Sequence, residues 1–95
     1  KKVRIFTDEI SYIESLREYI KVVTAQRTII TKMSLIQVEE MLSAEHFIRV
    51  HRSFIVAKDK IDSYTAVSVD IGDVEIPVGR NFKETLFTVL GDSGN

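Results

Sequence analysis

The sequence has no cysteine, a single proline and no long hydrophobic run. Without cysteine the chain cannot form disulfides or use a thiolate in catalysis, which fits a reducing compartment such as the cytoplasm. No apolar stretch approaches the ~20 residues that a membrane-spanning helix needs. The opening KKVRIFTDEI carries charges but lacks the apolar centre of a signal peptide. We therefore expect a cytoplasmic domain that has no membrane partner.

Recognisable catalytic and metal-binding motifs are also missing. The sequence contains no glycine-rich phosphate loop and no pair of carboxylates in an apolar setting. Ser53 lies close to His51, but no nucleophile elbow surrounds them, and strand geometry does not present them as a catalytic pair. His46 and His51 lack a third ligand at a usual metal-binding spacing. We predict that the protein is not an enzyme and that it has no catalytic residue, no metal site and no cofactor.

Charge is nearly balanced over the chain but unevenly distributed along it. The 95 residues include 13 basic and 14 acidic side chains, which gives a net charge of −1. Nucleic-acid-binding domains are usually basic, so the total argues against that class. Yet the segment 46–60 holds four Lys or Arg residues and both histidines against one acid. A near-neutral total can therefore hide one basic face.

Hydrophobic alternation predicts a mainly β, antiparallel domain. β-Branched residues are dense on both sides of Ala25, Gln26 and Arg27, which predicts a hairpin around that turn. The segment 58–63 should turn the chain. The predicted strands are 3–7, 10–16, 19–24 and 28–32, followed by the strand-like segment 47–56.

A second hairpin is predicted around a two-residue loop formed by Gly72 and Asp73. In this register Pro77 pairs with Ser68 on the outer face, which favours an edge or outer strand because proline cannot donate a ladder hydrogen bond. The pairs on the other face are all apolar, as a buried sheet face requires. They are Ile71 with Val74, Val69 with Ile76, and Val67 with Val78.

Two segments change to the period of an α-helix. In the internal one, Ser34 and Gln37 form a capping box, and Met33 with Val38 supplies a hydrophobic staple. Its predicted apolar face consists of Leu35, Val38, Met41 and Leu42. In the C-terminal one, Asn81 and Glu84 resemble an N-cap pair, and Gly91 ends the helix. Its predicted apolar stripe consists of Phe82, Leu86, Val89 and Leu90.

The segment FIRVHRSFIV, residues 47–56, breaks its own alternation. Its apolar residues share one parity, as in a strand with one buried face, and Arg52 interrupts that parity. Either a bulge or strand end turns Arg52 toward solvent, or Arg52 has a role in binding. We interpret His51 as structural, oriented by hydrogen bonds at the base of the loop.

Basic residues recur in two other segments, and each segment allows two interpretations. Arg80 is either a solvated turn residue or an anion ligand, because a helix N-terminus offers free N–H groups to a phosphate. Lys83 opposes the dipole of that helix, and a docked anion would relieve the conflict. Arg17, Tyr19 and Lys21 alternate in ESLREYIKV, and they form either an ordinary hydrated strand face or part of a binding surface.

Taken in order, several segments resemble the LytTR DNA-binding domain. They are IESLREYIKV, the capped helix SLIQVEEML, HFIRVHRSFIVAKDKID and IPVGRNFKETLF. The resemblance spans about residues 8–90, so we treat 1–95 as a single domain of this type, cut from a longer regulator. It implies an elongated stack of antiparallel β-sheets with one short internal helix and a C-terminal helix. Loops between strands would enter successive major grooves of double-stranded DNA.

The resemblance also implies which residues contact DNA. The middle residue of HRS and the basic residue of IPVGRN match Arg52 and Arg80. The loop REYIK matches a third contact region, where Arg17 or Lys21 would read bases because Ile20 occupies a position that can be polar. Ser53, Asn81 and Lys83 match positions near the phosphate backbone. The candidate DNA-binding set is Arg17, Tyr19, Lys21, Arg52, Ser53, Arg80, Asn81 and Lys83.

The partners implied by the resemblance are those of a bacterial transcription regulator in a two-component system. Members commonly follow an N-terminal receiver domain and bind paired DNA repeats as dimers, so we expect double-stranded DNA, a receiver domain and a homodimer on DNA. Considered alone, the basic loop ends also fit a β-rich module that binds a protein or an acidic ligand. Titration with duplex DNA against an acidic peptide separates the two.

Overall fold

The computed structural model describes residues 4–91. Within this range, eight strands and two α-helices alternate with three short 3-10 helices. The strands are β1 (Ile10–Leu16), β2 (Tyr19–Thr24), β3 (Thr28–Lys32), β4 (Phe47–His51), β5 (Phe54–Ala57), β6 (Ser63–Tyr64), β7 (Ser68–Ile71) and β8 (Val74–Pro77). The helices are α1 (Leu35–Met41) and α2 (Lys83–Val89), and the 3-10 helices are η1 (Thr7–Glu9), η2 (Lys58–Lys60) and η3 (Arg80–Phe82).

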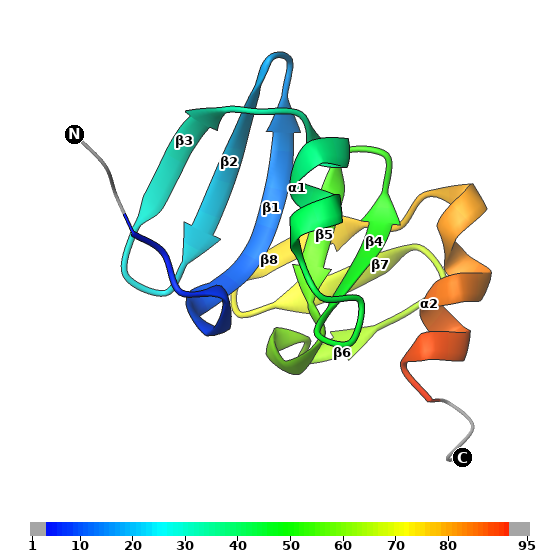
Figure 1. Ribbon diagram of the computed structural model, residues 1–95. Coiled ribbons are helices and arrows are strands. Elements are labelled where there is room, and N and C mark those ends of the chain that lie inside the picture. The colour runs from blue at the N-terminus through cyan, green and yellow to red at the C-terminus, as the bar shows by residue number, and fades with distance from the viewer. Residues whose placement is uncertain (1–3, 92–95) are drawn as a thin grey trace.

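The strands form two antiparallel sheets. The larger has the order β3-β2-β1-β5-β4, and the smaller has the order β6-β7-β8. Figure 1 shows α1 on one face of the larger sheet, β7 and β8 on the other face, and α2 beside β4. The molecule measures 47 × 24 × 23 Å, so the predicted elongated stack of antiparallel sheets is confirmed.

The β4–β5 hairpin separates two hydrophobic cores because both of its faces are buried. Phe47, Ile55 and Ala57 belong to the core beneath α1. Val50 and Val56 belong to the core that includes the smaller sheet and Leu86 of α2. Alternating side chains of one hairpin therefore hold both layers together, and they fix the position of the turn between β4 and β5.

The predicted strand at 3–7 is wrong where the structure describes it, and Val3 lies outside the described residues. Residues 4–6 belong to no strand, and Thr7 begins η1. Arg27 Nη2 donates to the carbonyl of Arg4 at 2.9 Å. This side-chain hydrogen bond holds the segment where strand pairing was predicted. The strands predicted at 10–16, 19–24 and 28–32 are confirmed at the same bounds.

The capping box of α1 is confirmed in both directions. The Gln37 N–H donates to Ser34 Oγ at 3.0 Å, and the Ser34 N–H donates to Gln37 Oε1 at 2.9 Å. Leu35 and Val38 are buried as predicted, but Met41 is 69% exposed. Leu42, which follows the last residue of the helix, is partly buried against the same core, so Met41 is the predicted member of the face that lies outside it.

The hairpin around Gly72 has the predicted register, including Pro77 opposite Ser68 on edge strand β8. Gly72 adopts φ +58°, a conformation that glycine tolerates at no steric cost. The buried face is narrower than predicted, because Val67 is 72% exposed and Val74 is also exposed. Only the centre of this small sheet is covered by the neighbouring core.

The predicted N-cap at Asn81 is wrong. Asn81 lies inside η3, and α2 begins at Lys83 with no side-chain cap. The Phe82 N–H donates to the Gly79 carbonyl at 2.9 Å, which closes a 3-10 turn where a cap was expected. In the apolar stripe Leu86 is buried, whereas Val89 is exposed.

Candidate nucleic-acid interface

FIRVHRSFIV forms two strands, β4 and β5, joined by a turn at Arg52 and Ser53. The pairing shifts register between Arg49 and His51, so Val50 is the extra residue of a bulge next to the strand end. Val50 is fully buried, whereas Arg52 is exposed. The bulge and the strand end together explain why Arg52 interrupts the apolar parity.

Side chains on both sides of this turn hold its backbone. The Ser53 N–H donates to His51 Nδ1 at 3.0 Å, as expected for a structural histidine at the base of the loop. Arg49 donates through Nε to the His51 carbonyl at 2.8 Å and through Nη2 to the Arg52 carbonyl at 2.6 Å. The turn that presents Arg52 is therefore tied at consecutive backbone positions.

Two backbone hydrogen bonds link three separate segments on one side of the molecule. The Ser15 N–H donates to the Ser53 carbonyl at 2.9 Å, which joins the end of β1 to the β4–β5 turn. The Gly79 N–H donates to the Val50 carbonyl at 2.8 Å, which joins the chain after β8 to β4. All three segments lie at the top of Figure 1. We call this surface the turn face and define it by residues 17–18, 52–53 and 80–81.

Gly79 leaves room for the aromatic ring of Phe82, which follows it in the same segment. A Cβ atom at this position would lie 2.9 Å from Cδ2 of Phe82 and 3.6 Å from the Cα of His51. The contact with the Phe82 ring is closer than real Cβ atoms make, so a larger residue would push the ring away. The Gly79 N–H, bonded to the Val50 carbonyl, places Arg80 beside the β4–β5 hairpin, and the missing Cβ leaves room for the Phe82 ring.

The β1–β2 turn brings Arg17 to the turn face but leaves Lys21 outside it. Arg17 is exposed and adopts φ +57°, and Tyr19 is also exposed. Lys21 lies within β2 opposite Glu14, and its Nζ is 3.2 Å from Glu14 Oε1. Of the two predicted base readers in this loop, Arg17 has the free charge.

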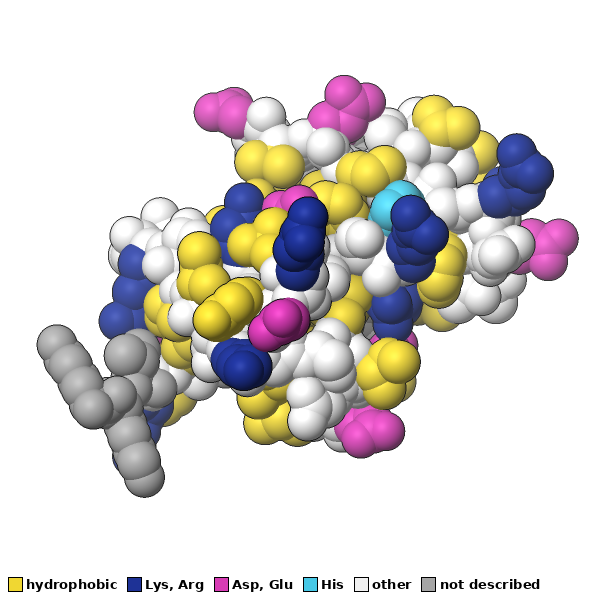
Figure 2. Space-filling model, turned by 90° about the horizontal axis from the view of Figure 1, so that it is seen from above, with side chains coloured by type: hydrophobic (Ala, Val, Ile, Leu, Met, Phe, Trp, Pro, Cys, Tyr) yellow, Lys and Arg dark blue, Asp and Glu magenta, His cyan; other side chains and the backbone are white. Residues whose placement is uncertain are grey.

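The four remaining cations of the predicted set are exposed: Arg17, Arg52, Arg80 and Lys83. Within residues 4–91, none of these four forms an ion pair; the paired cations are Lys21, Lys32 and Arg49. Figure 2 looks onto this side of the molecule and shows Lys and Arg side chains spread across it, with most acidic side chains toward the border. A chain of net charge −1 thus presents a locally positive surface.

The other two predicted members lie within the turn face. Ser53 is half-buried in the β4–β5 turn, and Asn81 is exposed within η3. The structure therefore brings together all predicted positions except Lys21, with Tyr19 and Lys83 directly beside the turn face along β2 and α2.

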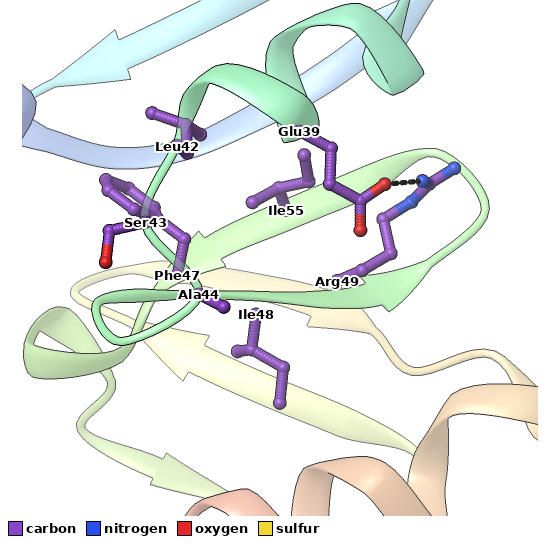
Figure 3. Close-up of a pocket in the computed structure, with 8 residues that line it drawn as sticks. All are labelled: Glu39, Leu42, Ser43, Ala44, Phe47, Ile48, Arg49 and Ile55. Carbon is purple, nitrogen blue, oxygen red and sulfur yellow. Dashed lines mark hydrogen bonds and ion pairs between the residues drawn. The ribbon is translucent and has the colours of Figure 1, made fainter.

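Residues 4–91 contain no group of three or more His, Asp or Glu side chains arranged to hold a metal ion. In the same range, no helix is long and apolar enough to cross a membrane. A small cavity of about 70 Å³ lies between α1 and the β4–β5 hairpin, with Glu39 and Arg49 at one side (Figure 3). Its lining is otherwise mostly apolar.

Arg49 is the residue that sequence reasoning missed. It pairs across the hairpin with Ile55, next to the buried Phe47, on a face that belongs to the core beneath α1. A charged residue on a face of that kind needs several hydrogen-bond acceptors. The sequence signal that could have identified Arg49 is the presence of apolar residues on both faces of the hairpin around it.

The chain is similar to known proteins over most of its length. The family model of the LytTr DNA-binding domain matches residues 1–91. Sensory transduction protein LytT of Oceanobacillus iheyensis is 38% identical over 68 aligned positions, which cover 63% of this chain and 28% of that protein. A solved structure described as the LytTr DNA-binding domain of a methyl-accepting/DNA response regulator from Bacillus cereus superposes with a TM-score of 0.83 at 25% identity. That match covers 94% of this chain and 87% of the other.

Proposed function

The chain belongs to the LytTr DNA-binding domain family, and from that premise we propose that it reads double-stranded DNA by placing the segments of the turn face in successive major grooves. The observation that carries the proposal is that Arg17, Arg52 and Arg80 lie on hydrogen-bonded neighbouring segments at one side of the molecule. All three are exposed and lie on turns that follow strands. Rigid strands beneath exposed arginines give each reader a defined direction.

Within this surface we assign the reading of bases to the arginines, and we assign contacts with the DNA phosphate backbone to the smaller or more flexible side chains. The planar guanidinium of Arg52 or Arg80 can donate to O6 and N7 of one guanine together. Arg17 is the preferred reader of the first loop, since the charge of Lys21 is held by Glu14. Ser53, Asn81, Tyr19 and Lys83 would contact phosphates and sugars, which position the domain.

The longer protein is proposed to be a bacterial transcription regulator with an N-terminal receiver domain. The chain spans only 28% of the length of the LytT relative, whose name describes sensory transduction. A regulator of this kind would bind paired repeats as a homodimer in the cytoplasm. We assign no catalysis to the domain, because His51 Nδ1 accepts from the backbone N–H of Ser53 and so is not placed to act as a base on the Ser53 hydroxyl.

Selection from a randomised duplex pool tests the proposal directly. The chain should enrich a defined sequence and should bind that duplex more tightly than a scrambled duplex of equal length and composition. An acidic peptide of matched charge serves as the competitor. Equal binding of selected, scrambled and peptide ligands would favour the alternative, a module that binds acidic partners through the same cations.

We expect the affinity for duplex DNA to fall steeply with salt. Four cations of the predicted set form no ion pair within residues 4–91, and we expect them to replace counterions condensed on the DNA. Four such contacts predict a slope of about −3 to −4 in a plot of log affinity against log salt. Lys21 should add little because it already pairs with Glu14. Binding titrations from low to physiological monovalent salt measure the slope. A flat response would contradict phosphate contact, since a net charge of −1 offers no general attraction.

A further inference from the structure

Arg49 makes four contacts to three separate parts of the described structure, although it does not belong to the turn face. Its Nε and Nη2 donate to the carbonyls of His51 and Arg52. Its Nη1 lies 2.7 Å from Glu39 Oε1 of α1. Its Cζ lies 5.9 Å from the centre of the Phe82 ring, at the end of η3. One guanidinium therefore joins α1, the β4–β5 turn and the segment that carries Arg80.

The burial and charge of Arg49 argue against a direct contact with DNA. Its side chain is 19% exposed, and its three donor nitrogens already have acceptors within the protein. Glu39 supplies the compensating negative charge. Figure 3 shows both side chains at the side of the cavity between α1 and β4, with the guanidinium directed toward Glu39. A phosphate would have to displace Glu39 or a turn carbonyl to reach it.

We propose that Arg49 is a positioning residue that fixes Arg52 and Arg80 relative to one another for base reading. It holds the carbonyl of Arg52, the residue whose side chain would enter the groove, and it contacts Phe82 two residues after Arg80. The inference rests on the proposed function, because it concerns the same readers. Preorganised readers lose less conformational entropy on binding, and they match one spacing of bases better than others.

The geometry requires arginine in particular. Three acceptors in three directions are met by separate N–H groups of one planar fork, whereas a lysine ammonium is a single point donor at the end of a flexible stem. Arg49→Lys therefore keeps the charge but cannot keep all three contacts. Glu39→Gln keeps an acceptor oxygen at α1 but removes the ion pair.

Arg49→Lys tests the proposal because it separates charge from position. We expect affinity for the selected duplex to fall roughly tenfold or more, as for other small misplacements of recognition groups. Affinity for a scrambled duplex and the salt slope should stay unchanged. A direct phosphate contact predicts the opposite pattern: conserved charge would preserve selected binding. Arg27→Lys is the matched control, since it alters an arginine–carbonyl contact at Arg4 away from the turn face.

Coupling to Arg52 provides a second readout. If Arg49 acts through Arg52, then Arg49→Lys should cost much less selected-site affinity in an Arg52→Ala background than in the parent chain. Independent, additive losses would overturn the proposal. Glu39→Gln should reproduce a smaller part of the Arg49→Lys effect.

A measurement without DNA keeps this inference distinct from the proposed function. In the free protein, Arg49→Lys should speed amide hydrogen exchange at Ser53 and Phe82, while Arg27→Lys should leave both unchanged. Faster exchange without any selective DNA binding would leave Arg49 as the anchor of the turn and reject the proposed function. Unchanged exchange together with unchanged selectivity would reject the positioning role. If either variant melts far below the parent, Glu39→Gln supplies the same comparison.

Discussion

Arg52→Ala and Arg80→Ala are each expected to weaken binding to the preferred duplex by about 1–3 kcal/mol, roughly 5- to 150-fold, with little effect on scrambled DNA. Each substitution removes an exposed guanidinium that forms no ion pair within residues 4–91. A base-reading arginine contributes to affinity only on a duplex that contains its base. Its removal should therefore reduce the preference for the selected duplex more than it reduces the affinity for DNA in general. Titrations of both duplexes at one fixed salt concentration measure the difference.

Lys83→Ala is the control for this pair. Lys83 is exposed in the first turn of α2, beside the segment that carries Arg80. A phosphate contact there carries no sequence information, so its removal should weaken preferred and scrambled duplexes alike. If Arg80→Ala also weakens binding to both duplexes equally, Arg80 contacts the phosphate backbone, and the proposal that it reads a base is wrong.

Val50→Ala is expected to lower stability by about 1–3 kcal/mol, whereas Arg52→Ala should change it by less than about 0.5 kcal/mol. Val50 is fully buried in the core that contains Leu86, and its truncation leaves a cavity there. Arg52 has an exposed side chain, and its backbone carbonyl stays available to Arg49 after the substitution. In a domain of this size, 1 kcal/mol shifts the melting temperature by roughly 4–8 °C.

Thermal melts and DNA titrations on both variants decide this prediction. Val50→Ala should melt lower yet retain the preference for the selected duplex at temperatures where it is folded. Arg52→Ala should melt like the parent and lose that preference. A lower melting point for Arg52→Ala than for Val50→Ala would mean that the Arg52 side chain has a structural partner, contrary to its exposure.

The strands that were predicted correctly are those whose signals are local. Period-two alternation and turn residues located β1, β2 and β3, and the Gly72 loop set the register of β7 and β8. The errors share a different cause. Asn81 is a residue type common at helix N-caps, but the Phe82 N–H bonds to the Gly79 carbonyl, which makes residues 80–82 a 3-10 turn, and α2 begins only at Lys83. The local hydrophobic pattern and the residue types do not predict such backbone hydrogen bonds.

Two features of the candidate site show which parts of its geometry could be predicted from the sequence and which could not. The strands at 10–16 and 19–24 were predicted separately, and joining them through the turn at 17–18 places Glu14 opposite Lys21 by counting alone. The neutralised charge of Lys21 was therefore accessible from the sequence. The partners of Arg49 were not, because Glu39 and Phe82 come from helices whose packing against β4 is fixed only in the folded core.

Arg17 occupies a position where stability and recognition make opposite demands. Its φ of +57° lies in the left-handed region, which glycine adopts freely and side chains with a Cβ adopt at a cost. A chain optimised for folding alone would carry glycine there. A search of this domain for stabilising substitutions would therefore select the tip of its first loop. The gain in stability would remove one of the four cations of the predicted DNA-binding set that form no ion pair within residues 4–91. Thermal robustness and affinity cannot both be maximised at this residue.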